Sequence, residues 1–336
     1  MKKILLSFVA FVFATVCLAQ SSLLATLSHE GNITTFYGAQ AWKQAHAAAA
    51  HGDVITLSSG TFVATDITKA VTVRGAGMSI DSSMVVEPTI IAGDFQIGIA
   101  DSVSQHLTLE GIYSNHTIKY SNVKNAQFLK CRLNSVIYAS SSTSVLRDAN
   151  FIHCRIADQL YLKNGSSASC VASVIGNIGS SGSADVFECQ NCVIVFNDGT
   201  SSSVYSSSFK NCVLIFWYTN RYLSSGNTAF NCIAFDADNP FQYTTGSNNK
   251  SLSDYAAFFK TYTGASLNNR DSETFQLTEA AKTQYLGMDG TEVGIYGGSL
   301  PFDPVPSNPQ ITKCNVAAKS TADGKLSVDI EVKAAE

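Results

Sequence analysis

The sequence predicts an all-β chain that coils into a parallel β-solenoid, and two observations support this prediction. The phrase Asn-Cys, followed by two apolar residues, returns at Asn191, Asn211 and Asn231 with a constant step of 20 residues. A fixed period of this length, carried by β-forming residues, is typical of stacked solenoid coils. Clusters of Asn, Ser and Gly separate the short apolar runs, as turns separate strands.

The repeated phrase also predicts where its side chains point. Asn suits a tight bend because it tolerates the left-handed backbone region, and Cys is small and apolar enough to stack inside. We expect Cys192, Cys212 and Cys232 to form an interior ladder of free thiols. The even number of cysteines after residue 19, eight, leaves disulfides as the alternative. A hydroxyl in this ladder has no assured hydrogen-bond partner, so Cys212→Ser is expected to lower the free energy of unfolding by about 1–3 kcal/mol.

Residues 1–19 are predicted to be a signal peptide. Lys2 and Lys3 precede an apolar run that is too short to span a bilayer, and Ala19 is a small residue at the expected cleavage site. Lipidation at Cys17 is the alternative, which the preceding valine disfavours. The expected location is therefore secreted: periplasmic, at the cell surface or extracellular.

Charge and hydropathy exclude two classes of partner. Without residues 1–19 the chain has 20 basic and 26 acidic residues, a formal charge of −6, and charged residues make up only 14% of the full sequence. A nucleic-acid-binding protein would show a basic stripe, which is absent from the sequence. No second apolar run has the length of a membrane helix, so we expect no integral membrane segment.

The first elements after the signal peptide are a cap helix and two strands. Residues 36–51 read as a helix, because Trp42, Ala45, Ala48 and Ala49 share one face, and Gly52 is a stop signal. This helix would cover the open end of the first coil, where unpaired core would otherwise be exposed. Strands are then expected at 54–57 and 70–73, with an inward aromatic residue at Phe62.

Short β-rich runs continue along the chain as far as residue 238. They occupy residues 89–91, 107–109, 118–120, 128–131, 151–154, 171–175, 186–189 and 204–205, followed by the repeats described above. The whole of residues 20–302 is predicted to be one parallel β-helix with its capping segments.

The C-terminal residues 303–336 are predicted to be a proline-rich link and a β-hairpin. Pro304, Pro306 and Pro309 stiffen the link, and the runs 311–316 and 326–332 alternate apolar and polar residues around an Asp-Gly turn. Two strands alone are marginally stable. The hairpin therefore either docks on the solenoid or begins a further module.

Strand alternation predicts an apolar outer face on the later coils. If the Cys ladder points inward, Val193, Val195, Val213, Ile215, Ile233 and Phe235 point outward. So large an apolar patch needs a cover. We expect residues 252–259, within a helix predicted at 252–262, to fold back onto this face as a lid. A homo-oligomer interface is the alternative.

Three sequence motifs resemble those of a known superfamily. The cap helix is followed by GDVITLSSGTF and KAVTVRGAG, and the chain closes the predicted solenoid with DGTEVGIYGG at 289–298. These phrases resemble secreted right-handed parallel β-helix proteins of the pectin-lyase-like superfamily, and the closing phrase resembles a bacterial group without an assigned function. The resemblance covers residues 36–302 and implies the right-handed fold and a secreted location.

The resemblance also says which catalytic groups to look for. Enzymes of this superfamily cleave acidic polysaccharides: the lyases use a Lys or Arg base, often with calcium, and the hydrolases use paired Asp residues. The motifs of both kinds are absent from this sequence. The remaining catalytic candidates are Asp198 and Asp238, two coils apart and so separated by roughly 10 Å in an in-register stack. They can equally be strand-ending residues at solvated turns.

A group of aromatic residues gives the candidate binding site. Trp217, Tyr218, Arg221 and Tyr222 lie close to the Asp candidates in the repeat, and aromatic faces stack on sugar rings. We therefore expect a carbohydrate-associated protein, a glycan binder or adhesion scaffold, without a recognisable catalytic site. The alternative is a polysaccharide lyase or glycoside hydrolase that acts on an acidic polysaccharide. No cofactor or metal site is expected, and calcium would belong only to a lyase.

Overall fold

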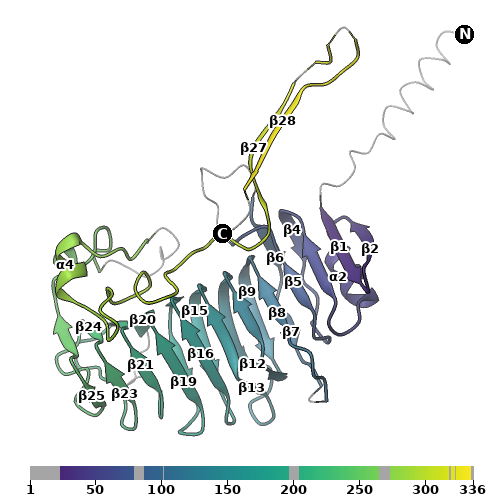
Figure 1. Ribbon diagram of the computed structural model, residues 1–336. Helices are drawn as coiled ribbons and strands as arrows, with labels where there is room; N and C mark the ends of the chain where they lie inside the picture. Colours follow the sequence, from purple (N-terminus) through teal and green to yellow (C-terminus); the bar gives the residue numbers. More distant parts are fainter. Residues whose placement is uncertain are drawn as a thin grey trace, which may run out of the picture.

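The protein forms a parallel β-solenoid of about nine turns (Figure 1). The structure is a computed structural model that describes residues 23–78, 87–100, 102–196, 204–264, 273–317, 319–321 and 323–333. The predicted signal peptide and Asp198 lie outside the described residues. Each turn contributes strands to two long sheets, so the predicted fold class is confirmed.

The first sheet runs the whole length of the solenoid, with parallel pairing from β3 to β25. Its strands, in spatial order, are β2 (Asn32–Tyr37), β1 (Leu24–His29), β3 (Val54–Leu57), β5 (Thr72–Arg74), β8 (Thr108–Glu110), β11 (Gln127–Leu129), β14 (Ala149–Ile152), β16 (Ser167–Val171), β19 (Val186–Gln190), β21 (Ser208–Lys210), β23 (Thr228–Phe230) and β25 (Thr245–Ser247).

The second sheet is also parallel throughout. It contains β4 (Gly60–Val63), β6 (Thr89–Ala92), β7 (Phe95–Ile97), β9 (Ile112–Tyr120), β12 (Arg132–Tyr138), β15 (Arg155–Leu162), β17 (Val174–Ile175), β18 (Ile178–Ser180), β20 (Val193–Phe196), β22 (Val213–Phe216), β24 (Ile233–Phe235) and β26 (Lys250–Leu252). A short parallel pair joins β10 (Asn122–Lys124) to β13 (Val145–Arg147). The predicted strand at 204–205 is wrong: Val204 is buried, but these residues are not in a strand.

A helix and a hairpin together close the first coil. Helix α2 (Ala41–Ala48) buries Trp42 and Ala45 against the core, and the Trp42 ring meets Phe95 edge-on. The predicted helix began too early, because residues 32–37 form strand β2, and Ala48 is exposed. Strand β1 pairs antiparallel with both β2 and β3, so this hairpin covers the edge of the first sheet.

The interior of the later coils follows the repeat. Ile194, Leu214 and Ala234 pair in register on successive strands and belong to the main core with Cys192, Cys212 and Cys232. Seven cysteines of the described chain, from Cys131 to Cys232, are buried free thiols, which confirms the predicted ladder. Burial raises the pKa of the Cys192 and Cys232 thiols, so these side chains behave as small apolar groups.

The outer face of these coils is covered as predicted. Val195, Ile215 and Phe235 are buried in a second apolar cluster with Phe258 and Phe259. We name the covering residues 252–264 and 273–285 the lid. The predicted helix at 252–262 is shorter, α3 (Tyr255–Phe258), and the lid continues to α4 (Glu279–Gln284). An isolated antiparallel bridge between Phe259 and Leu277 holds the two parts of the lid together.

After the lid, residues 286–308 run back along the solenoid, and we name this segment the strap (Figure 1). Its contacts follow the coils in reverse order. Asn231 Nδ2 donates to Leu286 O at 2.9 Å, and Met288 N donates to Asn211 Oδ1 at 2.9 Å. Asn191 Nδ2 then donates to Gly294 O at 3.2 Å. The Asn residues of the repeat therefore bind the strap as well as forming the turns.

The strap continues across the early coils. His153 Nε2 donates to Leu300 O at 3.3 Å, and Lys130 Nζ forms an ion pair with Asp303 at 2.7 Å. Ser307 N donates to the buried carboxylate of Glu110 at 2.7 Å, and Asn308 Nδ2 donates to Gly75 O at 3.1 Å. The part of the link at 303–308 thus lies against the solenoid.

The C-terminal hairpin projects from the early coils rather than from the last one (Figure 1). Strand β27 (Gln310–Val316) pairs antiparallel with β28 (Val328–Lys333), which confirms the predicted hairpin. Every residue of β28 is exposed.

Candidate functional site

The predicted site residues that the structure describes lie in two adjacent loops near the last coils. Trp217, Tyr218, Arg221 and Tyr222 follow β22, and Asp238 follows β24. The Asp238 backbone N–H donates to Thr219 O at 2.8 Å, which ties the two loops together. The structure therefore brings Asp238 beside the aromatic loop, whereas the Asp198 half of the proposed pair lies outside the described residues.

The aromatic side chains are unusually exposed for this protein. Trp217 is 49% and Tyr218 is 45% exposed, and the Arg221 guanidinium lies 5.3 Å from the centre of the Tyr218 ring. Tyr222 meets Tyr243 edge-on at 4.8 Å, and Tyr243 is 54% exposed. Four aromatic side chains of the described chain are exposed, and three of them are in these loops.

Tyr243 is a site residue that the sequence reasoning missed. It lies 21 residues after Tyr222, close to the 20-residue step of the repeat. That spacing predicts neighbouring positions on successive coils, so it was the available signal. We name Trp217, Tyr218, Tyr222 and Tyr243 the aromatic group.

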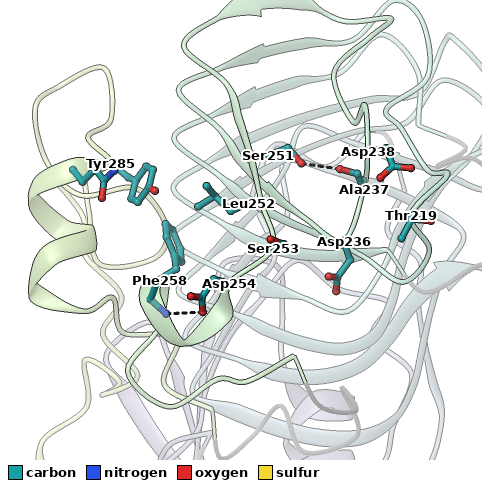
Figure 2. Close-up of a pocket in the computed structure, with 12 residues that line it drawn as sticks. Thr219, Asp236, Ala237, Asp238, Ser251, Leu252, Ser253, Asp254, Phe258 and Tyr285 are labelled. Carbon is teal, nitrogen blue, oxygen red and sulfur yellow. Dashed lines mark hydrogen bonds between the residues drawn. The ribbon is translucent and has the colours of Figure 1, made fainter.

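A cleft of about 540 Å³, lined by both polar and apolar side chains, opens between the last coils and the lid (Figure 2). Thr219, Asp236 and Asp238 lie on the solenoid side, and Phe258 and Tyr285 lie across from them. Its remaining lining residues are Ala237, Ser251, Leu252, Ser253, Asp254, Ala257 and Gln284. The size is within the range of small-molecule sites.

A smaller cleft of about 260 Å³ adjoins the first. Trp217, Tyr262 and Gly264 are among its lining residues, and Asp236 lines both clefts. The Tyr255 hydroxyl donates to Asp236 Oδ2 at 2.6 Å, and the Tyr255 ring stacks on Phe235 with centres 4.4 Å apart. This contact joins the lid to the solenoid at the wall between the two clefts.

The backbone turn explains the position of Asp236. Its φ is +58°, in the left-handed region that Asp tolerates better than most residues. Burial, the hydrogen bond to Asp236 and its negative charge raise the pKa of the Tyr255 phenol. Tyr255 therefore stays protonated and acts as a donor to the carboxylate.

The charged side chains that line the large cleft are all acidic. They are Asp236, Asp238 and Asp254, and Asp254 also caps α3 by accepting from Ala257 N at 3.0 Å. A uronate lyase needs a basic group to bind and deprotonate its substrate, and no Lys, Arg or His lines this cleft. Its chemistry is that of hydrogen-bond acceptors and hydroxyl groups.

Two general features complete the description of the site. Within the described ranges, no group of three or more His, Cys, Asp or Glu side chains is placed to hold a metal ion. No helix in the described part of the chain has the length and apolar character needed to cross a bilayer.

Comparisons with protein-family models, curated proteins and solved structures find no match to this chain.

Proposed function

We propose that the protein is a secreted or cell-surface β-helix protein that binds carbohydrate through the aromatic group and the adjoining cleft. The exposure of Trp217, Tyr218 and Tyr243 carries this proposal, because Tyr37 is the one other exposed aromatic side chain among the described residues. Sugar rings present an apolar face that stacks on aromatic side chains, and their hydroxyl groups bond to carboxylates and hydroxyls. The binding site needs no catalytic group.

The proposal includes a relationship to the pectin-lyase-like superfamily. The phrases at 52–62, 69–77 and 289–298 support it, together with a solenoid whose first coil is closed by a helix. The signal-peptide pattern at residues 1–19 supports secretion. Cleavage before Gln20 is tested by mass analysis of the mature N-terminus and by fractionation of the producing cells.

A glycan array tests the binding function. Wild-type protein is expected to bind a defined subset of glycans, and Trp217→Ala and Tyr243→Ala are each expected to weaken that binding at least about tenfold, or 1.4 kcal/mol. Tyr37→Ala is the matched control, because Tyr37 is also exposed but lies in β2 at the opposite end of the solenoid. Binding that survives both site substitutions overturns the proposed site.

A polysaccharide lyase or glycoside hydrolase is the second candidate function. Arg132 and Arg155 occupy paired positions on adjacent strands of the second sheet, and two guanidinium groups can neutralise uronate carboxylates. Both arginines also have structural contacts, with the Tyr113 and Phe302 rings respectively. Release of unsaturated or reducing products from a panel of acidic polysaccharides, lost in Arg132→Gln or in Asp238→Asn, would favour an enzyme.

A further inference from the structure

Strand β2 forms the edge of the first sheet at the N-terminal end of the solenoid (Figure 1). It pairs with β1 on one side, and no described strand pairs with its other side. Its six residues, Asn-Ile-Thr-Thr-Phe-Tyr, favour β structure and include no charge, proline or glycine. The edge at the opposite end, β25, has three residues, one of them Gly246. Short, charged or covered edge strands resist pairing with another chain, and β2 has none of these protections among the described residues.

The turn between β1 and β2 decides which backbone groups of β2 point away from β1. Glu30 and Gly31 form a two-residue turn with φ of 47° and 82°, so the residues that flank the turn form a hydrogen-bonded pair. The bond from Gly38 N to Leu23 O, at 3.0 Å, continues the same alternation beyond the other end of the strands. The backbone N–H and C=O groups that this alternation points to the open edge belong to Ile33, Thr35 and Tyr37.

The same three residues share one face of the strand, because they are two positions apart. Ile33 is 72% and Tyr37 is 51% exposed, and exposed Thr35 lies midway between them. This face therefore has a symmetric pattern, with a large exposed side chain on either side of a threonine. A second β2 in the antiparallel direction would place Thr35 opposite its own copy and Ile33 opposite Tyr37 of that copy.

We propose that β2 pairs antiparallel with β2 of a second copy of this chain, around a two-fold axis at Thr35. The pairing uses all three edge-facing residues in about six backbone hydrogen bonds, and it covers Ile33 of each copy with Tyr37 of the other. The uncharged strand brings no like charges together, and a two-fold contact closes at two copies. The first sheet then continues from one solenoid into the other.

The size of the contact sets its expected strength. One pair of six-residue strands is small for a protein interface, so we expect a dissociation constant of about 10–100 µM. A glycan array run at nanomolar protein therefore reports single copies, and Tyr37→Ala remains a control for the aromatic group. The proposed pairing does not depend on carbohydrate binding.

Sedimentation equilibrium at protein concentrations of about 1–200 µM tests the association. The mass of the wild-type protein is expected to rise from one chain toward two. Thr35→Lys and Thr35→Glu are each expected to weaken the association at least about tenfold, because each places like charges opposite one another at the axis. An equimolar mixture of the two variants is expected to restore the larger mass, which also shows that both are folded. Thr245→Lys is the matched control, because Thr245 is an exposed threonine in β25 at the opposite end of the same sheet.

Engineered cysteines test the register of the pairing. They are placed in a Cys314→Ser background, which removes the one cysteine after residue 19 outside the seven buried thiols. Thr35→Cys is expected to form a disulfide between copies in a glutathione redox buffer, because opposite residues of a hydrogen-bonded pair lie about 5.5 Å apart. Ile33→Cys is the control, because this register places residue 33 more than about 10 Å from its own copy.

Three results would overturn the proposal or its parts. A mass of one chain at every concentration overturns the association. An association that persists in both Thr35→Lys and Thr35→Glu, or that Thr245→Lys abolishes, overturns the role of β2. Equal cross-linking of Thr35→Cys and Ile33→Cys overturns the two-fold axis at Thr35.

Discussion

At the scale of single residues, the coils from Lys130 to Cys232 pair a left-handed turn residue with a small inward one. Lys130 and His153 have φ of 51° and 54°, like Asn191 at 52°, and each is followed by a buried cysteine. Ala172 has the same conformation and is followed by buried Ser173. The Asn-Cys motif therefore belongs to a longer series of equivalent turns. The earlier turns of this series use other residues, which their neighbours hold in the same left-handed conformation.

The serine in this ladder changes the expectation for Cys212→Ser. Ser173 Oγ donates to Val171 O at 2.8 Å, and the Cys212 thiol already points to the equivalent carbonyl, Lys210 O, at 3.2 Å. A hydroxyl at 212 therefore has a partner that the sequence did not reveal. We expect Cys212→Ser to lower the free energy of unfolding, measured in urea, by less than about 1 kcal/mol. A decrease of about 3 kcal/mol, together with a smaller decrease for Cys212→Ala, would show that the hydroxyl has no favourable partner.

His153 predicts a pH dependence of stability. Burial, with the charge of Lys130, lowers the pKa of His153 below its ordinary value of 6.5. Below pH 6.5 the unfolded chain binds more protons at this residue than the folded chain, so stability falls as the pH drops. His153→Asn, which keeps the left-handed turn, is expected to make the decrease in unfolding free energy between about pH 6.5 and 5 shallower.

The control for this titration is built into the chain. Burial also lowers the pKa of His46, which remains in both proteins and contributes equally to both pH profiles. Parallel profiles for wild type and His153→Asn would show that His153 does not titrate differently in the folded state.

At the scale of elements, the lid and the strap are fixed to the solenoid in different ways. The lid buries aromatic side chains, with Phe258 and Phe235 rings 5.2 Å apart. The strap is held by side-chain amides and by close backbone approach: a Cβ on Gly287 would lie 2.7 Å from Asn211 Cγ, and one on Gly297 would lie 1.6 Å from Glu292 O. The glycines of the closing segment thus allow it to lie on the Asn ladder.

Asn211→Ala tests the attachment of the strap. The substitution removes the acceptor for Met288 N and places alanine at a φ of +54°. We therefore expect the free energy of unfolding, measured in urea, to fall by about 2–3 kcal/mol. Asn248→Ala is the matched control: Asn248 has a φ of +59° and bonds to Asn231 rather than to the strap. Equal losses in the two variants would mean that the strap contact contributes nothing.

Phe258→Asp tests the lid. Phe258 is 1% exposed, and a carboxylate there removes a buried ring and buries a charge among aromatic side chains. We expect a monomer that is less stable by at least about 3 kcal/mol, measured by chemical unfolding. A variant that keeps wild-type stability but changes its elution on a sizing column would point instead to an interface between copies.

At the scale of the whole molecule, the strap makes the two ends of the solenoid interdependent. It begins beside Asn231 near the last coil and ends where Asn308 contacts Gly75 in an early coil. Between these points it satisfies buried polar groups, among them Glu110. A strap across many coils opposes their separate unfolding, because a repeat otherwise contacts only its neighbours.

Two truncations separate the strap from the hairpin. A chain that ends at Asn308 loses only the exposed hairpin and its short lead, so its melting temperature is expected to stay within about 2 °C of the full chain. A chain that ends at Tyr285 also loses the strap, and we expect a decrease of more than about 10 °C, since about 1 kcal/mol corresponds to 2–4 °C at this size. If calorimetry shows the same decrease in melting temperature for both truncated chains, the stabilisation belongs to the hairpin rather than to the strap.

The sequence by itself determined the coil, its inside and outside, the covered outer face and the C-terminal hairpin. These features depend on a repeat of 20 residues and on strand alternation, which are local properties of the chain. It also placed Trp217 and Asp238 in the candidate site, because both lie at a fixed offset from the repeat.

Only the tertiary structure decided the path of the strap and the contact between Tyr255 and Asp236. Each joins loops or segments whose shape the repeat does not specify, so no periodicity predicts the contact. The same reason explains the turns at Lys130 and His153: their left-handed conformation is imposed by the stacked coils and the strap, not by the preference of the residue itself.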